Sequence, residues 1–125
     1  MNQEPRGELT IRTLAMPADA NPAGDIFGGW VISQMDLACG IVAGQRANGR
    51  VVTVAIDGMS FIQPVHVGDV LEVFAEVDSV GRSSMNIHVE AWSRRGRIGD
   101  HVKVTEAQFK FVALDEEGRP TPLPD

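Results

Sequence analysis

The sequence predicts an α+β domain in which one long helix packs against an antiparallel sheet. Residues 27–45, FGGWVISQMDLACGIVAGQ, form an apolar segment that is too long for a strand, and no other part of the chain offers a comparable helix. Three later segments, 69–80, 85–92 and 101–114, alternate between apolar and polar residues, as strands with one buried face do. A single helical segment with strands gathered elsewhere indicates α+β architecture.

The N-terminal part of the chain is predicted to run as strand, loop and helix. Residues 8–14, ELTIRTL, alternate and indicate a strand, whereas residues 17–25, PADANPAGD, contain two prolines and a glycine and indicate a loop. The helix that follows is expected to stop at Asn48-Gly49, with Arg46 in its last turn, where a cation favours the helix dipole.

The first strands after the helix are predicted from a valine-rich run. Residues 51–57, VVTVAID, begin this run, and it continues from Ser60 to Val67, where Pro64 marks an edge or a break. The next alternating segment, residues 69–80, leads into Gly81-Arg82-Ser83-Ser84, which is typical of a hairpin connection.

The last strand is predicted over residues 101–114, after a turn at residues 96–99. Its apolar parity slips between Val104 and Ala107, and such a slip indicates a β-bulge. The whole chain, residues 1–125, is expected to form one domain, with residues 1–7 and 115–125 as flexible ends.

Composition and charge exclude several classes of protein. The single cysteine, Cys39, allows no intrachain disulfide, and with only three histidines it gives no zinc-binding pattern. The first residues, MNQEPRGELT, contain no apolar signal region, so we expect a cytoplasmic protein. The formal net charge of −6 argues against a general nucleic-acid binder. Residues 27–45 are long enough to span a membrane but carry Asp36, so a buried helix in a soluble fold is the better interpretation.

Winding the helix at about 100° per residue separates a bulky face from a strip of small residues. The bulky face holds Trp30, Val31, Met35, Leu37, Ala38, Ile41 and Val42, and the strip holds Gly29, Ser33, Asp36, Gly40 and Ala43. Asp36 is the only large polar group on this strip. Small neighbours let a ligand, a strand or another subunit approach the helix closely.

The glycines at the helix start and the carboxylate further along suit acyl-group chemistry. Gly28 and Gly29 lie where free N–H groups and the positive end of the helix dipole favour a developing oxyanion. Asp36, about 10 Å along the axis at 1.5 Å per residue, is placed to activate water or to attack directly. Other interpretations stay open, because a lone helical Asp is commonly solvated or hydrogen bonded, and glycine pairs also serve close packing. Asp25 is a second candidate carboxylate or a helix N-cap.

Three ordered motifs carry a resemblance to a known family. They read NPAGDIFGGWVISQMD, RVVTVAIDGMSFIQPVHVGD and VGRSSMNIHVEAW. The chain resembles the YciA-type acyl-CoA thioesterases, relatives of the brain-type acyl-CoA hydrolases in the hotdog-fold superfamily, over residues 9–114. The resemblance implies a long helix wrapped by a curved antiparallel sheet, homodimers commonly assembled as a trimer of dimers, and active sites at the dimer interface. It implies hydrolysis of acyl-CoA to a carboxylic acid and CoA, with no metal or redox cofactor.

The resemblance also assigns catalytic roles to individual residues. The catalytic Asp of the family's S-Q-M-D motif falls on Asp36, and the Asn with which related enzymes pair it across the subunit boundary falls on Asn21. The F-G-G turn falls on Phe27, Gly28 and Gly29, whose backbone would polarise the thioester carbonyl, with the Gly29 N–H as oxyanion donor. Without the family, Asn21 before Pro22 is equally explained as the cap of a turn.

Substrate contacts follow from the same resemblance. The G-R-S-S turn falls on Gly81, Arg82, Ser83 and Ser84 and implies contact with the CoA nucleotide, although such a turn is also commonly solvated. The cluster Arg94, Arg95 and Arg97 is either a solvated hairpin tip or a contact for a CoA phosphate, since Arg suits bidentate phosphate binding. Phe61 and Ile62 are predicted to contact the acyl chain.

Two other functions fit the same fold. A hotdog dehydratase or hydratase would use a His near the helix start, but Phe27 precedes Gly28-Gly29 and no His occurs in residues 1–65. A non-catalytic acyl-CoA-binding module would give Asn21 and Asp36 no catalytic role. Cys39 lies mid-helix between bulky neighbours and is interpreted as a core residue, not a nucleophile.

Overall fold

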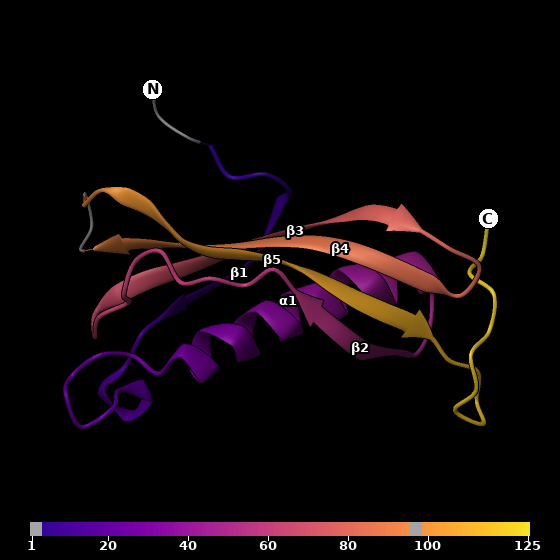
Figure 1. Ribbon diagram of the computed structural model, residues 1–125, viewed down its shortest axis with the longest axis horizontal. Helices are drawn as coiled ribbons and strands as arrows, with labels where there is room; N and C mark the ends of the chain where they lie inside the picture. The colour runs from indigo at the N-terminus through magenta and orange to yellow at the C-terminus, as the bar shows by residue number, and fades with distance from the viewer. Residues whose placement is uncertain (1–3, 96–98) are drawn as a thin grey trace.

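The structure is a computed structural model that describes residues 4–95 and 99–125, and it consists of a sheet with one long helix on one face (Figure 1). All strand pairs are antiparallel, in the order β1-β3-β4-β5-β2. The elements are β1 (Glu8–Leu14), the short 3-10 helix η1 (Pro17–Asp19), α1 (Gly28–Ala47), β2 (Val51–Asp57), β3 (Asp69–Val80), β4 (Ser84–Arg95) and β5 (His101–Ala113). The predicted α+β class is confirmed.

The boundaries of α1 follow the signals read in the sequence. Phe27, with φ of −59° and ψ of 134°, directly precedes the first helical residue, and Asn48 ends the helix in the left-handed conformation with φ of 52°. An asparagine tolerates this conformation better than most residues, and its N–H donates to carbonyls of the last turn. Arg46 lies in that last turn, so the predicted stop at Asn48-Gly49 is confirmed.

The core lies between α1 and the face of the sheet that the helix covers. From the helix it contains Val31, Met35, Ala38, Cys39 and Ala43, and from the sheet it contains Leu71, Val73, Ala75, Ile87, Val89 and Phe109 among others. The alternation predicted for residues 69–80 is confirmed for Leu71, Val73 and Ala75, which are buried on this face. Full burial of such a side chain stabilises the fold by about 1.5–3 kcal/mol.

The bulky face and the strip of small residues do not coincide with the buried and exposed faces of α1. Leu37 and Ile41 belong to the bulky face, yet 56% and 46% of their surfaces are exposed. Ala43 belongs to the strip of small residues and is fully buried. The stripe of α1 that meets the sheet is therefore narrower than the apolar part of the helix. The periodicity of apolar residues shows which of them share a helix face. It does not show whether another element covers that face.

The predicted continuation of the valine-rich run into a strand from Ser60 to Val67 is wrong. Residues 58–65 are irregular, and only His66 forms an isolated bridge, with Asp25. The physical reason lies in the sheet order: β5 already pairs with β4 and β2, so no open edge is left beside it. The segment instead donates the N–H of Ile62 to the carbonyl of Val104, at 2.7 Å.

Val104 is also the bulge that the sequence indicated in the last strand. Ala91 pairs with Thr105 and Trp92 with Lys103, so Val104 is the extra residue between two ladder pairs. The bulge frees its carbonyl for Ile62. The predicted turn at residues 96–99 falls mostly on residues 96–98, which lie outside the described residues.

Both ends of the described chain make hydrogen bonds to the sheet. The N–H of Thr121 donates to Ala113 and the N–H of Leu123 donates to Arg82, at 2.9 and 2.8 Å. At the other end, the N–H of Arg6 reaches Glu90 on β4, at 3.3 Å. The flexibility expected for residues 1–7 and 115–125 stays a prediction.

Candidate active site

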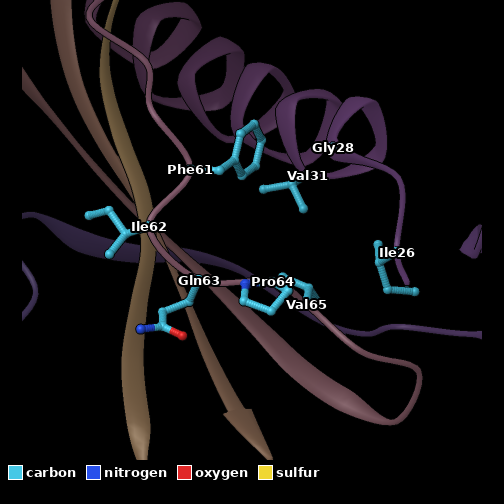
Figure 2. A pocket seen from close by; sticks show the side chains of 8 residues that line it. All are labelled: Ile26, Gly28, Val31, Phe61, Ile62, Gln63, Pro64 and Val65. Atoms are coloured by element: carbon cyan, nitrogen blue, oxygen red, sulfur yellow. The ribbon is translucent and has the colours of Figure 1, made fainter. Parts of the chain in front are cut away.

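The start of α1 forms one side of an apolar cavity of about 300 Å³ (Figure 2). The cavity is lined by Ile26, Gly28, Val31, Phe61, Ile62, Gln63, Pro64 and Val65. The irregular segment after β2 supplies the opposite side. The size lies at the lower end of the range for small-molecule sites, about 300–1,000 Å³.

The two glycines at the helix start differ in their surroundings. A Cβ on Gly28 would lie 3.4 Å from Cζ of Phe61, so the Phe61 ring stands directly against the first turn. A Cβ on Gly29 would meet nothing within 4 Å. Trp30 and Val31 donate the first bonds of the helix to the Phe27 carbonyl, so the N–H groups of both glycines lie ahead of the helical ladder.

The predicted acyl contacts differ in direction. Phe61 points toward Val31 and the helix start, whereas the side chain of Ile62 points away from both (Figure 2). Both residues border the cavity, and both are about half exposed or more. Phe27 is exposed beside the helix start.

Asp36 is half-buried on α1 and is held by a residue that the sequence analysis did not single out. The hydroxyl of Thr53 on β2 donates a hydrogen bond of 2.6 Å to its Oδ1. Thr53 pairs with the core residue Phe111, which places it on the helix-covered face of the sheet. The alternation in VVTVAID places Thr53 on the same face as Val51. A polar residue at an inward-facing position of an apolar strand is the sequence signal that could have identified it.

Asn21 lies in the loop before the helix and its side-chain oxygen is engaged. Oδ1 accepts the backbone N–H groups of Ala23 and Asp25, at 3.0 and 3.1 Å. This is the turn-capping role that the sequence left open, and it directs the amide nitrogen, with its two donors, away from those backbone groups. Asp25 itself contacts His66 Nδ1, at 3.3 Å.

Within one chain the structure does not bring all the predicted catalytic residues together. Gly28 lines the cavity and has Phe27 and Gly29 as its chain neighbours, but Asp36 is about two helical turns from Gly29, roughly 10 Å along the axis. The side-chain bonds described for Asn21 and Asp36 join them to different partners. A site that uses both therefore needs a second surface beside α1.

The surface around Asp36 has the properties of such a contact. The apolar residues exposed on the helix near it are Leu37 and Ile41. On the adjacent strand Val52, Val54 and Ile56 are exposed, and Val52, one residue before the inward-facing Thr53, lies on the sheet face away from the helix. Strand β2 is also an edge of the sheet, so its outer backbone groups face away from β5. Exposed apolar side chains beside an open sheet edge are typical of a protein interface.

The residues predicted to meet CoA lie at two ends of the sheet. Gly81 to Ser83 form the β3–β4 turn, where the Gly81 N–H donates to Ser84 and the Arg82 carbonyl accepts from Leu123. At the other end Arg95 Nε contacts the buried carboxylate of Asp69, at 3.1 Å. Arg94 donates to the Gly99 carbonyl, at 3.3 Å. Arg97 lies outside the described residues.

Cys39 is a core residue. It is fully buried one helical turn after Asp36, and burial raises the pKa of its thiol above the usual range, with a further increase from the Asp36 carboxylate. Among residues 4–95 and 99–125 no cluster of His, Cys, Asp and Glu is suited to a metal ion. Over the same ranges the structure has no helix with the length and apolarity to cross a bilayer.

Comparison with known proteins identifies close relatives over nearly the whole chain. Residues 23–99 match the model of the thioesterase superfamily. The acyl-CoA thioester hydrolase YciA of Salmonella typhimurium is 50% identical over 127 residues, which cover 99% of this chain and 96% of that protein. The hexameric thioesterase y2039 from Yersinia pestis has a TM-score of 0.93 and 51% identity, over 98% of this chain and 99% of that one. A hexameric hotdog fold thioesterase of Campylobacter jejuni, Cj0915, has a TM-score of 0.88 and 38% identity, over 94% and 91%.

Proposed function

The chain belongs to the YciA-type acyl-CoA thioester hydrolases of the thioesterase superfamily, and from this premise we propose how its residues cleave acyl-CoA. It has the hotdog fold and hydrolyses an acyl-CoA thioester to a carboxylic acid and CoA. The observation that carries the proposed mechanism is the half-buried carboxylate of Asp36, whose orientation is fixed by a hydrogen bond from the Thr53 hydroxyl.

Asp36 is the group that drives attack on the thioester. As a base, it takes a proton from a water molecule while the water oxygen forms a bond to the carbonyl carbon. As a nucleophile, its own oxygen would form that bond and give a transient anhydride that water then opens. In both routes the C–S bond breaks and CoA leaves as a thiolate that gains a proton. Thr53 occupies one lone pair of Oδ1 and so fixes the direction of Oδ2 toward the substrate.

The start of α1 stabilises the charge that develops on the carbonyl oxygen. The N–H groups of Gly28 and Gly29 precede the helical ladder and lie at the positive end of the helix dipole. The open space beside Gly29 lets a substrate oxygen approach its N–H. A preorganised backbone donor of this kind contributes about 2.7–4 kcal/mol to transition-state stabilisation.

Two copies of the chain complete each site. The Asp36 of one copy is proposed to face the helix start and Asn21 of the other across a seam formed by Leu37, Ile41 and the edge strand β2. The apolar exposure of these residues and the 10 Å separation within one chain support this arrangement. The Yersinia and Campylobacter relatives are hexameric, and we propose three such dimers for this protein as well.

CoA is proposed to lie with its acyl group in the cavity at the helix start and its nucleotide against the turn from Gly81 to Ser84. Arg82 in this turn is the cation that would meet a phosphate. Acyl-CoA is the substrate, and the proposed mechanism uses no metal or redox cofactor.

Release of free CoA thiol tests the proposal. The wild-type protein is expected to liberate thiol from acyl-CoA, and Asp36→Asn is expected to reduce kcat at least a thousandfold while it keeps the fold and the oligomeric state. Binding without thiol release by the wild type would indicate a binding module, and a changed acyl chain without thiol release would indicate a dehydratase. Full activity of a folded Asp36→Asn variant would remove Asp36 from its role.

A further inference from the structure

The side of the cavity opposite the helix, here called the wall, is residues 60–65, and hydrogen bonds hold it at three points. The carbonyl of Ser60 accepts a bond of 2.7 Å from the hydroxyl of Thr105, whose residue has 0% of its surface exposed. The N–H of Ile62 donates to the Val104 bulge, and the carbonyl of Val65 accepts from Ile26 just before the helix, at 3.0 Å. The wall is irregular in conformation but fixed in position.

Phe61 lies between the first two of these fastening points. Its ring atoms Cζ and Cε2 lie 3.4 and 3.5 Å from the place where a Cβ on Gly28 would be, so the ring closes the gap between wall and helix (Figure 2). Val31 lies beside it on the helix. An acyl chain that enters the cavity at the start of α1 would therefore meet the Phe61 ring if it extended further along the helix.

We propose that Phe61 limits the length of the acyl chain that the enzyme accepts, and that Thr105 is a positioning residue that holds Phe61 in place. The inference rests on the proposed function, because the accessible length of the acyl chain is counted from a thioester carbonyl bound at the Gly29 N–H. A cavity of about 300 Å³ takes on the order of ten groups of water size, at about 30 Å³ each. The chain length at which kcat/KM is highest is therefore expected to depend on the side chain at position 61.

The first test compares Phe61→Ala with the wild type on acyl-CoA thioesters from two to sixteen carbons. Removal of the ring extends the cavity along the helix, so the optimum of kcat/KM shifts to longer chains. Each methylene newly buried raises kcat/KM about fourfold, the equivalent of about 0.8 kcal/mol. Leu9→Ala, which removes an exposed apolar side chain from the opposite edge strand β1, is the control and leaves the optimum unchanged.

The second test addresses the fastening of the wall. Thr105→Val keeps the shape of the side chain but removes the donor to Ser60, and we expect a broader chain-length profile through changes in KM more than in kcat. Thr105→Ser keeps a hydroxyl and restores the wild-type profile. A merely structural role for Thr105 would lower activity toward all chain lengths by the same factor.

The outcomes separate this inference from the proposed function. If the wild type releases no thiol from any acyl-CoA, the proposed function is wrong. If the wild type is active and Phe61→Ala has the same chain-length optimum, the proposed role of Phe61 is wrong and the function stands. Phe61→Leu leaves a smaller apolar side chain and gives a smaller shift in the same direction, so it decides the question if the alanine variant does not fold.

Discussion

The Thr53 hydroxyl donates to Oδ1 of Asp36 at 2.6 Å, and this bond joins the edge strand β2 to the middle of α1. It fixes the orientation of a carboxylate that the surrounding apolar residues would leave free to rotate. Every catalytic role that we propose for Asp36 depends on this orientation.

Removal of the Thr53 hydroxyl is predicted to impair turnover. Thr53→Val is expected to lower kcat about ten- to a hundredfold with little change in KM, because a hydrogen bond to a charged group contributes about 1.5–3 kcal/mol. Thr53→Ser keeps the donor and stays close to wild-type activity. Steady-state kinetics on one acyl-CoA measures both effects, and an unchanged kcat in the valine variant would show that the bond is only structural.

A methyl group at Gly29 is predicted to separate stability from activity. A Cβ there meets nothing within 4 Å in the chain, and alanine is the better helix former, so Gly29→Ala is expected to stabilise the fold by up to about 1 kcal/mol. The same methyl group occupies the approach to the proposed oxyanion donor and lowers kcat/KM at least about tenfold.

Gly44→Ala is the matched control for Gly29→Ala, because it adds a methyl group near the other end of α1, 3.7 Å from the Gly49 carbonyl oxygen. It is expected to keep full activity. Thermal unfolding and thiol release are measured on both variants. Equal activity of the two would contradict the proposed use of the Gly29 N–H.

The thiol of Cys39 is predicted to be inert in the folded protein. Burial, and then the Asp36 carboxylate, raise its pKa, so the reactive thiolate is scarce and shielded at pH 8. A disulfide reagent is expected to label Cys39 on the order of a hundredfold more slowly in buffer than in denaturant. Rapid labelling of the native protein with loss of activity would show that Cys39 lies at the surface or in the site.

Glu90 is predicted to make folding sensitive to acid. Burial alone would raise the pKa of Glu90, but contacts from His88 at 2.7 Å, Trp92 Nε1 at 2.9 Å and the Arg6 N–H outweigh it and lower the pKa. A lowered folded pKa means that this stabilisation is present above the unfolded value, about 4.3, and is lost as pH falls through the folded pKa.

The free energy of unfolding is therefore expected to fall less steeply below pH 5 in Glu90→Gln than in the wild type. Urea denaturation at several pH values measures this slope. Glu117→Gln, at an exposed position in the C-terminal turn, is the control and keeps the wild-type slope. Equal slopes for Glu90→Gln and the wild type would show that the contacts of Glu90 do not depend on its charge.

Most of the fold was predictable from local signals. Alternation located β1, β3, β4 and β5, and Asn48 located the end of α1, because these features depend on near neighbours in the sequence. The run from Ser60 to Val67 was mispredicted because a strand also needs a free partner edge. The exposure of Leu37 and Ile41 could not be read from the sequence, because exposed apolar residues on a helix can have the same periodicity as core residues.

The site was predictable only in part for the same reason. The glycines of the helix start and Asp36 stand out in the sequence by composition and position. Thr53 acts through a contact between two elements, and its pattern in VVTVAID indicates only that it faces inward. The proposed contact joins Asn21 of one copy to Asp36 of another copy. The spacing of these two residues along one chain therefore does not indicate it.

The most direct test of the central claim is a mixture of two inactive variants, Asp36→Asn and Asn21→Asp. Asn21→Asp keeps the oxygen that caps the loop and removes the amide donor, so it addresses the proposed contact and not the turn. If each site combines Asn21 of one copy with Asp36 of the other, co-expressed variants form mixed dimers with one intact site each, and thiol release recovers to about a quarter of the wild-type rate. If the mixture is as inactive as its components while mixed dimers are present, the site lies within a single chain and the account is wrong.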